Sequence, residues 1–317
     1  MNRAIRPEPP SGGKGTGSPF YGTLQYCRCL EDFGTPVLLG EGICCALDRQ
    51  VPGTCFRDVI YPYPMYAIMD EPGLIAALRS LPCGQAVTAT FVTDPIAGVQ
   101  PTPSQWDLAR PWKSHLLVDN SINGACSFSS KIRYYSGRAR SKFGVRCEII
   151  TGNRAGLLDR WLDLWSLLVA RHGLVGLKAL SSGYFRRLFD LEGVLLAVLS
   201  SGEGIHSIHI WILDGDRSYS HLHASDEYAY AASGNYLLYS STLSWLKDSG
   251  YRISLLGSSP GSGSNDGLFR FKRQFANSSA SNHLLGLIID REAYLELTGS
   301  SSYAGGYFPS YREGELL

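Results

Sequence analysis

The stretch Gly267–Phe275 (GLFRFKRQF) carries the side chains best suited to catalysis, and Lys272 is the central candidate. A cation is needed near the oxyanion that forms when an amine attacks an ester or thioester. If this stretch were a strand, Phe269 and Phe271 would share one face with Phe275, and Lys272 would lie on the other. The alternative interpretation is a solvated lysine on a basic edge.

Two arginines, Arg270 and Arg273, flank this lysine. Guanidinium groups match phosphate in shape and charge, so both are candidates for binding the phosphates of a nucleotide-linked acceptor or of tRNA. A surface role without a ligand is the alternative.

Histidines form a second group of candidates. His221 and His223 are two residues apart, which predicts that they share one face of a strand and that one of them acts as a general base. Asp226 follows as a further catalytic candidate, or as a cap of the next turn. His206 and His209 lie on opposite faces of a strand by the same rule, so we expect no metal site there.

A basic segment, Lys131–Arg146, contains no acidic residue and interleaves tyrosines with its charges. Lys131, Arg138 and Lys142 are its candidates for binding a polyanion. The alternative is a solvated helix face.

These candidates must be positioned by a chain of many short elements. Hydrophobic periodicity, turn residues and helix caps predict helices and strands. The expected helices are 66–81, 154–172, 181–189, 236–249 and 268–275, and the expected strands are 86–91, 115–118, 194–200, 206–213, 218–223, 253–256 and 284–289. Residues 97–112 are expected to be a proline-rich loop, and Gly257–Gly267 a loop beside the site. An antiparallel meander that continues into β-α-β predicts an α+β fold.

The order of motifs in the second half resembles the FemAB-like branch of the GNAT acyltransferase superfamily. The shared pattern is a strand ending in His-Leu-His-Ala-Ser, a Gly-Asn helix, a strand ending at Leu256-Gly257, and the box GLFRFKRQF. Residues 128–144 (FSSKIRYYSGRARSKFG) and 307–312 (YFPSYR) are similar to other parts of that family. The resemblance covers residues 55–317 and is best across 155–290.

The resemblance implies two tandem GNAT-like domains, each with a mixed, largely antiparallel sheet. We expect a tail over 1–19, a first domain over 20–150 and a second over 151–317. It also implies that Phe271 and Lys272 lie at the transfer site, with the lysine stabilising the developing charge. Asn235 and Tyr239, on the Gly-Asn helix, are further candidates for substrate binding.

The implied reaction moves an aminoacyl group from aminoacyl-tRNA to a small-molecule or peptide amine, without a resident cofactor. One alternative is an N-acyltransferase that uses acyl-CoA or an acyl carrier protein on an amino sugar or natural-product amine. Another is a catalytically inactive binding module on the same fold.

Composition sets the limits on these hypotheses. The 317 residues are 44% hydrophobic and 18% charged, which indicates a globular protein, and the net charge of +1 leaves polyanion binding to local patches. The first residues lack an apolar leader segment, so we expect a cytoplasmic protein without a membrane span, and a monomer. The eight cysteines are expected to be free thiols.

Overall fold

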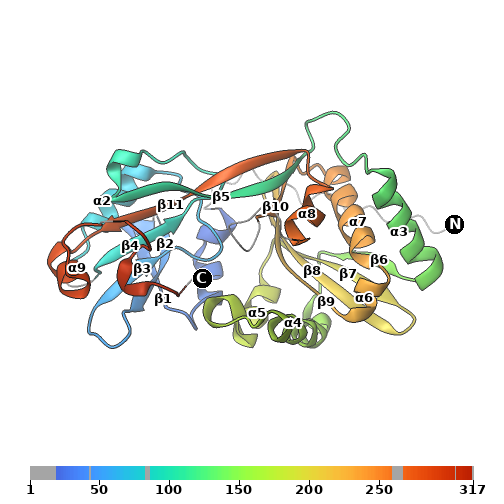
Figure 1. The fold of residues 1–317 in the computed structure, drawn as a ribbon, viewed down its shortest axis with the longest axis horizontal. Coiled ribbons are helices and arrows are strands. Elements are labelled where there is room, and N and C mark those ends of the chain that lie inside the picture. The colour runs from blue at the N-terminus through green and yellow to red at the C-terminus, as the bar shows by residue number, and fades with distance from the viewer. Residues whose placement is uncertain (1–18, 43, 83–85, 259–266, 304, 316–317) are drawn as a thin grey trace.

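A single mixed sheet runs through the computed structural model, which describes residues 19–42, 44–82, 86–258, 267–303 and 305–315 (Figure 1). Its eleven strands follow the order β1-β2-β3-β4-β11-β5-β10-β9-β8-β7-β6. The strands are β1 (Thr35–Leu39), β2 (Cys44–Gln50), β3 (Arg57–Ile60), β4 (Thr88–Val92), β5 (Leu108–Asp119), β6 (Arg146–Ile150), β7 (Val194–Ser201), β8 (Gly204–Asp214), β9 (Arg217–Ser225), β10 (Ile253–Gly257) and β11 (Ser278–Ile288).

Most neighbouring strands are antiparallel, and the pairs β3–β4 and β9–β10 are parallel. In the antiparallel run β6-β7-β8-β9, short hairpins join β7 to β8 and β8 to β9, whereas α4 and α5 lie between β6 and β7 in the chain. Helices α6 and α7 after β9 return the chain to β10 in a parallel crossover. This arrangement confirms the α+β class.

The helices are α1 (Leu24–Cys29), α2 (Glu71–Arg79), α3 (Ser130–Phe143), α4 (Leu158–His172), α5 (Ser182–Asp190), α6 (Glu227–Ala231), α7 (Gly234–Asp248), α8 (Gly267–Arg273) and α9 (Arg291–Thr298). In the half formed by β6–β10, alternate residues of each strand enter different clusters. Leu196 and Ile210 pack toward α4 and α5, whereas Leu195 and Trp211 pack toward α3 and α7. Figure 1 shows these two helix groups on the two sides of the strands.

Two long strands join the halves of the sheet. β11 comes from the end of the chain, yet it pairs with β4 on one side and with β5 on the other. β6 and α3 precede residue 151 and contact β7 and α7 of the later segment. The division into domains at residue 150 therefore stays a prediction. Residues 1–18 of the expected tail lie outside the described part of the chain.

Two expected elements differ from the structure. The helix expected from residue 66 begins at Glu71, because Tyr66 forms a bridge with Thr93 and Asp70 caps the helix by accepting from the N–H of Gly73. The expected loop 97–112 ends early, since β5 begins at Leu108. Residues 267–273 form helix α8, which confirms the helix expected over 268–275 and excludes the strand considered for the box.

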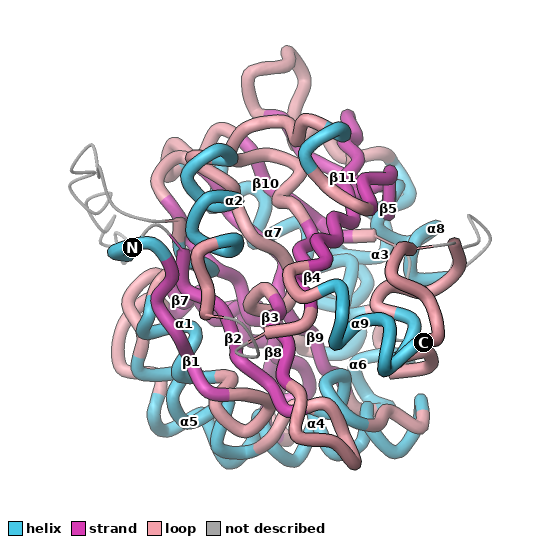
Figure 2. The backbone as a smooth tube through the Cα atoms, turned by 90° about the vertical axis from the view of Figure 1, so that its left-hand side faces the viewer, coloured by secondary structure: helices cyan, strands magenta, loops and turns pink. Residues whose placement is uncertain are grey.

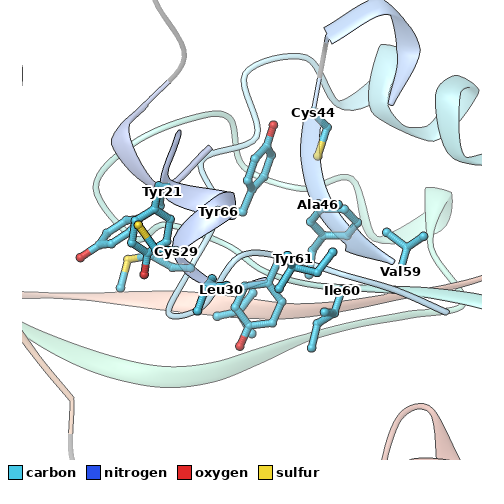
Figure 3. Packing of buried hydrophobic residues seen from close by; sticks show 14 of the residues in the cluster. Tyr21, Cys29, Leu30, Cys44, Ala46, Val59, Ile60, Tyr61 and Tyr66 are labelled. Atoms are coloured by element: carbon cyan, nitrogen blue, oxygen red, sulfur yellow. The ribbon is translucent and has the colours of Figure 1, made fainter. Parts of the chain in front are cut away.

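Figure 3 shows the core beneath the first strands, where Tyr21, Cys29 and Leu30 approach side chains of β2 and β3. Figure 2 shows the same strands at the front of the molecule. The described cysteines (27, 29, 44, 45, 55, 126 and 147) are all free, and Cys83 lies outside the described residues. Within the described ranges, no helix is both long enough and apolar enough to cross a bilayer.

A buried ion pair ties the end of the chain to the sheet. Arg312 donates through Nε and Nη2 to the carboxylate of Asp58 on β3, and through Nη2 to the carbonyl of Gln50 at 2.8 Å. The side chains of Arg312 and Asp58 are only 6% and 2% exposed. This contact gives the YFPSYR ending a structural role.

We expect Arg312→Ala to lower the free energy of unfolding by about 3–5 kcal/mol, because Asp58 would stay buried with its main counter-charge removed. Urea unfolding monitored by circular dichroism measures the change. A loss below about 1 kcal/mol would show that Arg49, whose Nε is 3.3 Å from Asp58, compensates on its own.

Candidate active site

A gap in the hydrogen bonding of the sheet defines the candidate site. β10 pairs with β9 only from Ile253 to Leu255, opposite residues 217–219, and with β5 only as far as the pair Gly257–Leu116. Beyond that point β9 continues to Ser225 and β5 continues to Leu108, and the described residues place no strand between them. The ends of β10, β9 and β5 thus surround a place where a substrate can reach backbone and side chains from both strands.

Lys272 reaches this gap from α8. The side chain is buried, with Lys272 only 9% exposed, and a Cβ placed on Gly257 would lie 3.1 Å from the Lys272 Nζ. Gly257 also has a φ of +90°, which a residue with a side chain rarely adopts. The glycine therefore lets the ammonium group approach the end of β10, and the solvated-lysine interpretation is excluded.

In a helical turn, residues four apart lie on the same side, which differs from the alternation of a strand. Phe271 and Phe275 are four residues apart and lie together, with ring centroids 5.2 Å apart. Both pack on Tyr239 of α7, at 5.1 and 5.4 Å. Tyr236 of α7 covers Phe271 at 5.1 Å. This aromatic cluster fixes α8, and with it Lys272, against α7.

His223 lies behind the cluster among hydroxyl groups. Its Nε2 is 2.9 Å from the Ser207 Oγ and 3.1 Å from the Ser225 Oγ, and Ser225 in turn donates to Asn235 at the start of α7. Burial, followed by the positive charge of Lys272, lowers the pKa of His223 to about 3. His223 and Asn235, both predicted site residues, are therefore brought together, with a neutral imidazole.

The prediction that His221 shares a face with His223 is wrong. A bulge in β9 opposite Ile210 and Trp211 inserts one residue, which reverses the side-chain alternation. His221 points to the other side of the sheet, where its Nδ1 is 3.1 Å from the Tyr21 hydroxyl and its Nε2 is 2.6 Å from the Tyr184 hydroxyl. His221 is thereby removed from the lysine side of the strand.

Asp226 is held in a separate network. It caps α6 by accepting from the N–H of Ala229, and its Oδ2 is 2.9 Å from Arg160 and 3.0 Å from the His206 Nδ1. Both His206 and Asp226 line a surface pocket of about 590 Å³ beside Tyr228. The capping interpretation is confirmed, and the contacts place Asp226 with His206 rather than with the lysine.

His206 and His209 have separate neighbours: His206 contacts Asp226 and Tyr228, whereas His209 lies beside Trp211 and Tyr239. Among the described residues, no group of three histidine, cysteine or acidic side chains is arranged to hold a metal ion.

The basic candidates are exposed on neighbouring helices. Arg270 and Arg273 are exposed on α8, and Lys131, Arg140 and Lys142 are exposed on α3. Arg138, half-buried, lies over the Phe143 ring at 5.0 Å.

Helices α3 and α8 both contact the same aromatic side chain, Tyr236 of α7. Tyr236 stacks on Tyr135 of α3 at 4.9 Å and contacts Phe271 of α8 at 5.1 Å. The exposed basic residues of α3 and α8 thus lie on two helices that both pack against Tyr236 of α7, and we call them the basic surface of α3 and α8.

One titratable group at the gap was not a candidate from the sequence. His115 on β5 is 5% exposed, and its pKa is lowered to about 4 by burial first and then by Lys272 and Lys113. The only signal in the sequence is a single polar residue within the apolar run of a strand.

Buried neutral histidines predict sensitivity to acid. His209 is fully buried and its pKa is held well below the ordinary value by burial and by the nearby His223 and Lys272. The unfolded chain therefore binds a proton below about pH 6.5 that the folded chain does not, so stability is retained above that pH and falls as the pH decreases.

We expect His209→Gln to reduce the slope of unfolding free energy between pH 6 and 4.5 by up to about 1.4 kcal/mol per pH unit. Chemical denaturation of both proteins across this range measures it. Equal slopes would show that His209 takes up a proton in the folded state.

Comparison with known proteins places this site in a recognised fold. Residues 127–273, from just before α3 to the end of α8, match the family model described as an acetyltransferase (GNAT) domain. A search of curated proteins finds no match.

Solved structures extend the likeness over most of the chain. FemX aligns with a TM-score of 0.63 at 11% identity, covering 88% of this chain and 94% of that one. The C-terminal domain of a protein assigned as lysylphosphatidylglycerol synthetase from Agrobacterium fabrum aligns at 0.59 and 15% identity, covering 90% and 95%. L-PGS from Bacillus licheniformis aligns at 0.55 and 14% identity, covering 88% and 95%. At these identities the likeness establishes the fold.

Proposed function

We infer that this chain, an acyltransferase with the GNAT fold, moves an aminoacyl group from aminoacyl-tRNA to an amine acceptor. The observation that carries the proposal is the buried ammonium group of Lys272 beside Gly257, in the gap between β5 and β9. A cation fixed in a largely desolvated site interacts more strongly with a developing oxyanion than the same group in water.

The proposed reaction needs no covalent enzyme intermediate and no resident cofactor, since an aminoacyl ester is already activated. The amine attacks the ester carbonyl, a C–N bond forms, and the ribose oxygen leaves. Lys272 stabilises the oxyanion, while Phe271 and Tyr239 shape the wall of the site. The acceptor is a small-molecule or peptide amine.

Two observations support tRNA as the carrier. The basic surface of α3 and α8 is the charged feature nearest the site, and it suits a polyanion. One of the similar structures is named as the C-terminal domain of a lysylphosphatidylglycerol synthetase, and that name implies attachment of a lysyl group to phosphatidylglycerol, which is an aminoacyl transfer.

An acyl-CoA donor is the second candidate, because the matching family model is described as an acetyltransferase domain. The edge of β9 beyond Tyr219 offers backbone groups to an extended donor. Either donor delivers its carbonyl to the same lysine.

A donor panel tests the proposal. The protein is incubated with an amine mixture and either a radiolabelled aminoacyl-tRNA pool or a set of acyl-CoA thioesters, and amide formation is followed. We expect amide from aminoacyl-tRNA that depends on protein concentration. Amide from acyl-CoA alone would move the assignment to the second candidate, and binding of donors without any product would favour an inactive module.

A further inference from the structure

His115 lies at the edge of the gap and has no role in the reaction as described so far. On β5, Leu116 pairs with Gly257, the last residue of β10, and His115 is the next residue along the strand. It is therefore the first residue of β5 beyond the end of β10, on the wall opposite β9.

The imidazole of His115 is buried with few polar neighbours. The residue is 5% exposed, and within the described part of the chain neither Nδ1 nor Nε2 has a hydrogen-bond partner of ordinary geometry. The side chain of Asn282 of β11 interacts with the ring and raises its pKa, and its Oδ1 also accepts from the N–H of Lys113 at 2.8 Å. Asn282 can engage one ring nitrogen at most, so the other is a buried polar atom beside the gap that is available to a ligand.

The other histidines near Lys272 are occupied. The His223 Nε2 is shared by two serine hydroxyls, and the His209 Nε2 is 2.8 Å from the Ser220 Oγ. The His209 Nδ1 has no partner, but that ring is fully buried between Trp211 and Tyr239. His115 alone among these three combines a free ring nitrogen with a position where β10 has ended.

We propose that His115 is the general base of the transfer, accepting the proton that the acceptor nitrogen loses after it attacks the donor carbonyl at Lys272. This role rests on the proposed function. The C–N bond forms first and leaves a positive charge on nitrogen and a negative charge on the carbonyl oxygen. His115 takes one N–H proton, the C–O bond to the ribose breaks, and the imidazolium returns the proton to the leaving oxygen.

The charges around His115 suit this sequence of steps. The groups that influence its pKa besides burial are Lys272 from α8, Lys113 from its own strand and the amide of Asn282 from β11. Burial and the two ammonium groups lower its pKa to about 4, so the ring is neutral at pH 7 and able to accept a proton. Once the C–N bond has formed, the acceptor nitrogen is positively charged and much more acidic than a free alkylammonium. A weak base therefore suffices, and the resulting imidazolium gives the proton up readily.

Two nucleophiles distinguish a base from a structural residue. The purified full chain is assayed with an alkylamine and with hydroxylamine, which is a weaker base and loses its proton to water without help. We expect His115→Gln to slow transfer to the alkylamine about 10²-fold or more and transfer to hydroxylamine only a few-fold. His283→Gln on β11, whose ring also has a buried unpaired Nδ1, is the matched control and should leave both rates unchanged.

The outcomes separate this inference from the proposed function. Transfer by the wild type to neither nucleophile, from any donor, overturns the function and the base role together. Transfer by the wild type with an unchanged His115→Gln rate overturns the base role alone. Equal loss with both nucleophiles assigns His115 a positioning role and also overturns it. If His115→Gln lacks a cooperative thermal transition, His115→Asn is assayed in its place by the same criteria.

Discussion

Replacing Lys272 by methionine should lower kcat for transfer about 10²- to 10³-fold while the protein stays folded, as removal of one oxyanion donor typically does. Methionine fills the space of the lysine stem but carries no charge, so packing against Gly257 is retained. Single-turnover assays with saturating donor isolate the chemical step. The loss should appear in the rate constant with little change in donor affinity, because the oxyanion exists only in the transition state.

Lys247 provides the matched control. It lies on α7 and donates through Nζ to the carbonyl of Ala125 at 2.7 Å, which is a structural contact. Lys247→Met should lower stability and leave the rate within a few-fold of wild type. If Lys272→Met turns over at the wild-type rate, its ammonium group does not stabilise the transition state.

Neutralising α3 should weaken tRNA binding strongly and leave the chemical step intact. The triple variant Lys131→Gln, Arg138→Gln and Lys142→Gln removes three positive charges from a helix without acidic residues. We expect Kd for tRNA at physiological salt to rise at least about tenfold, and the slope of log Kd against log salt to fall by about 2–3. Filter binding over a salt series measures both values.

A triple variant on other surfaces controls for net charge. Arg28, Arg79 and Arg186 are exposed on α1, α2 and α5, so their replacement by glutamine changes the charge by the same amount. This variant should keep the wild-type salt slope. Equal loss in both variants would show that only net charge matters, and no loss in either would remove α3 from the tRNA surface.

The fold was largely predictable because its strands and helices have strong local signals. Val194–Ser201 and Ile253–Gly257 are apolar runs bounded by turn residues, and Asp70 and Ser181 are ordinary helix caps. The box 267–275 allows two interpretations, because its aromatic and basic residues alternate as in a strand although the order of elements predicts a helix over 268–275. Tertiary contacts with Tyr236 and Tyr239 instead stabilise a short helix.

The site was only partly predictable, for two physical reasons. A β-bulge is invisible in the spacing of His221 and His223, so their shared face could not be excluded from the sequence. The position of His115 depends on where β10 ends relative to β5, which is a matter of register between strands far apart in the sequence. Lys272 could be predicted as a site residue because the residues of its motif are adjacent in the sequence.

A co-crystal structure with a stable, amide-linked aminoacyl-nucleotide analogue tests the central claim most directly. Our account predicts that the analogue lies in the gap between β5 and β9, with its carbonyl oxygen about 3 Å from the Lys272 Nζ. An analogue bound elsewhere, such as in the pocket lined by His206 and Asp226, with Lys272 far from the carbonyl, would contradict it.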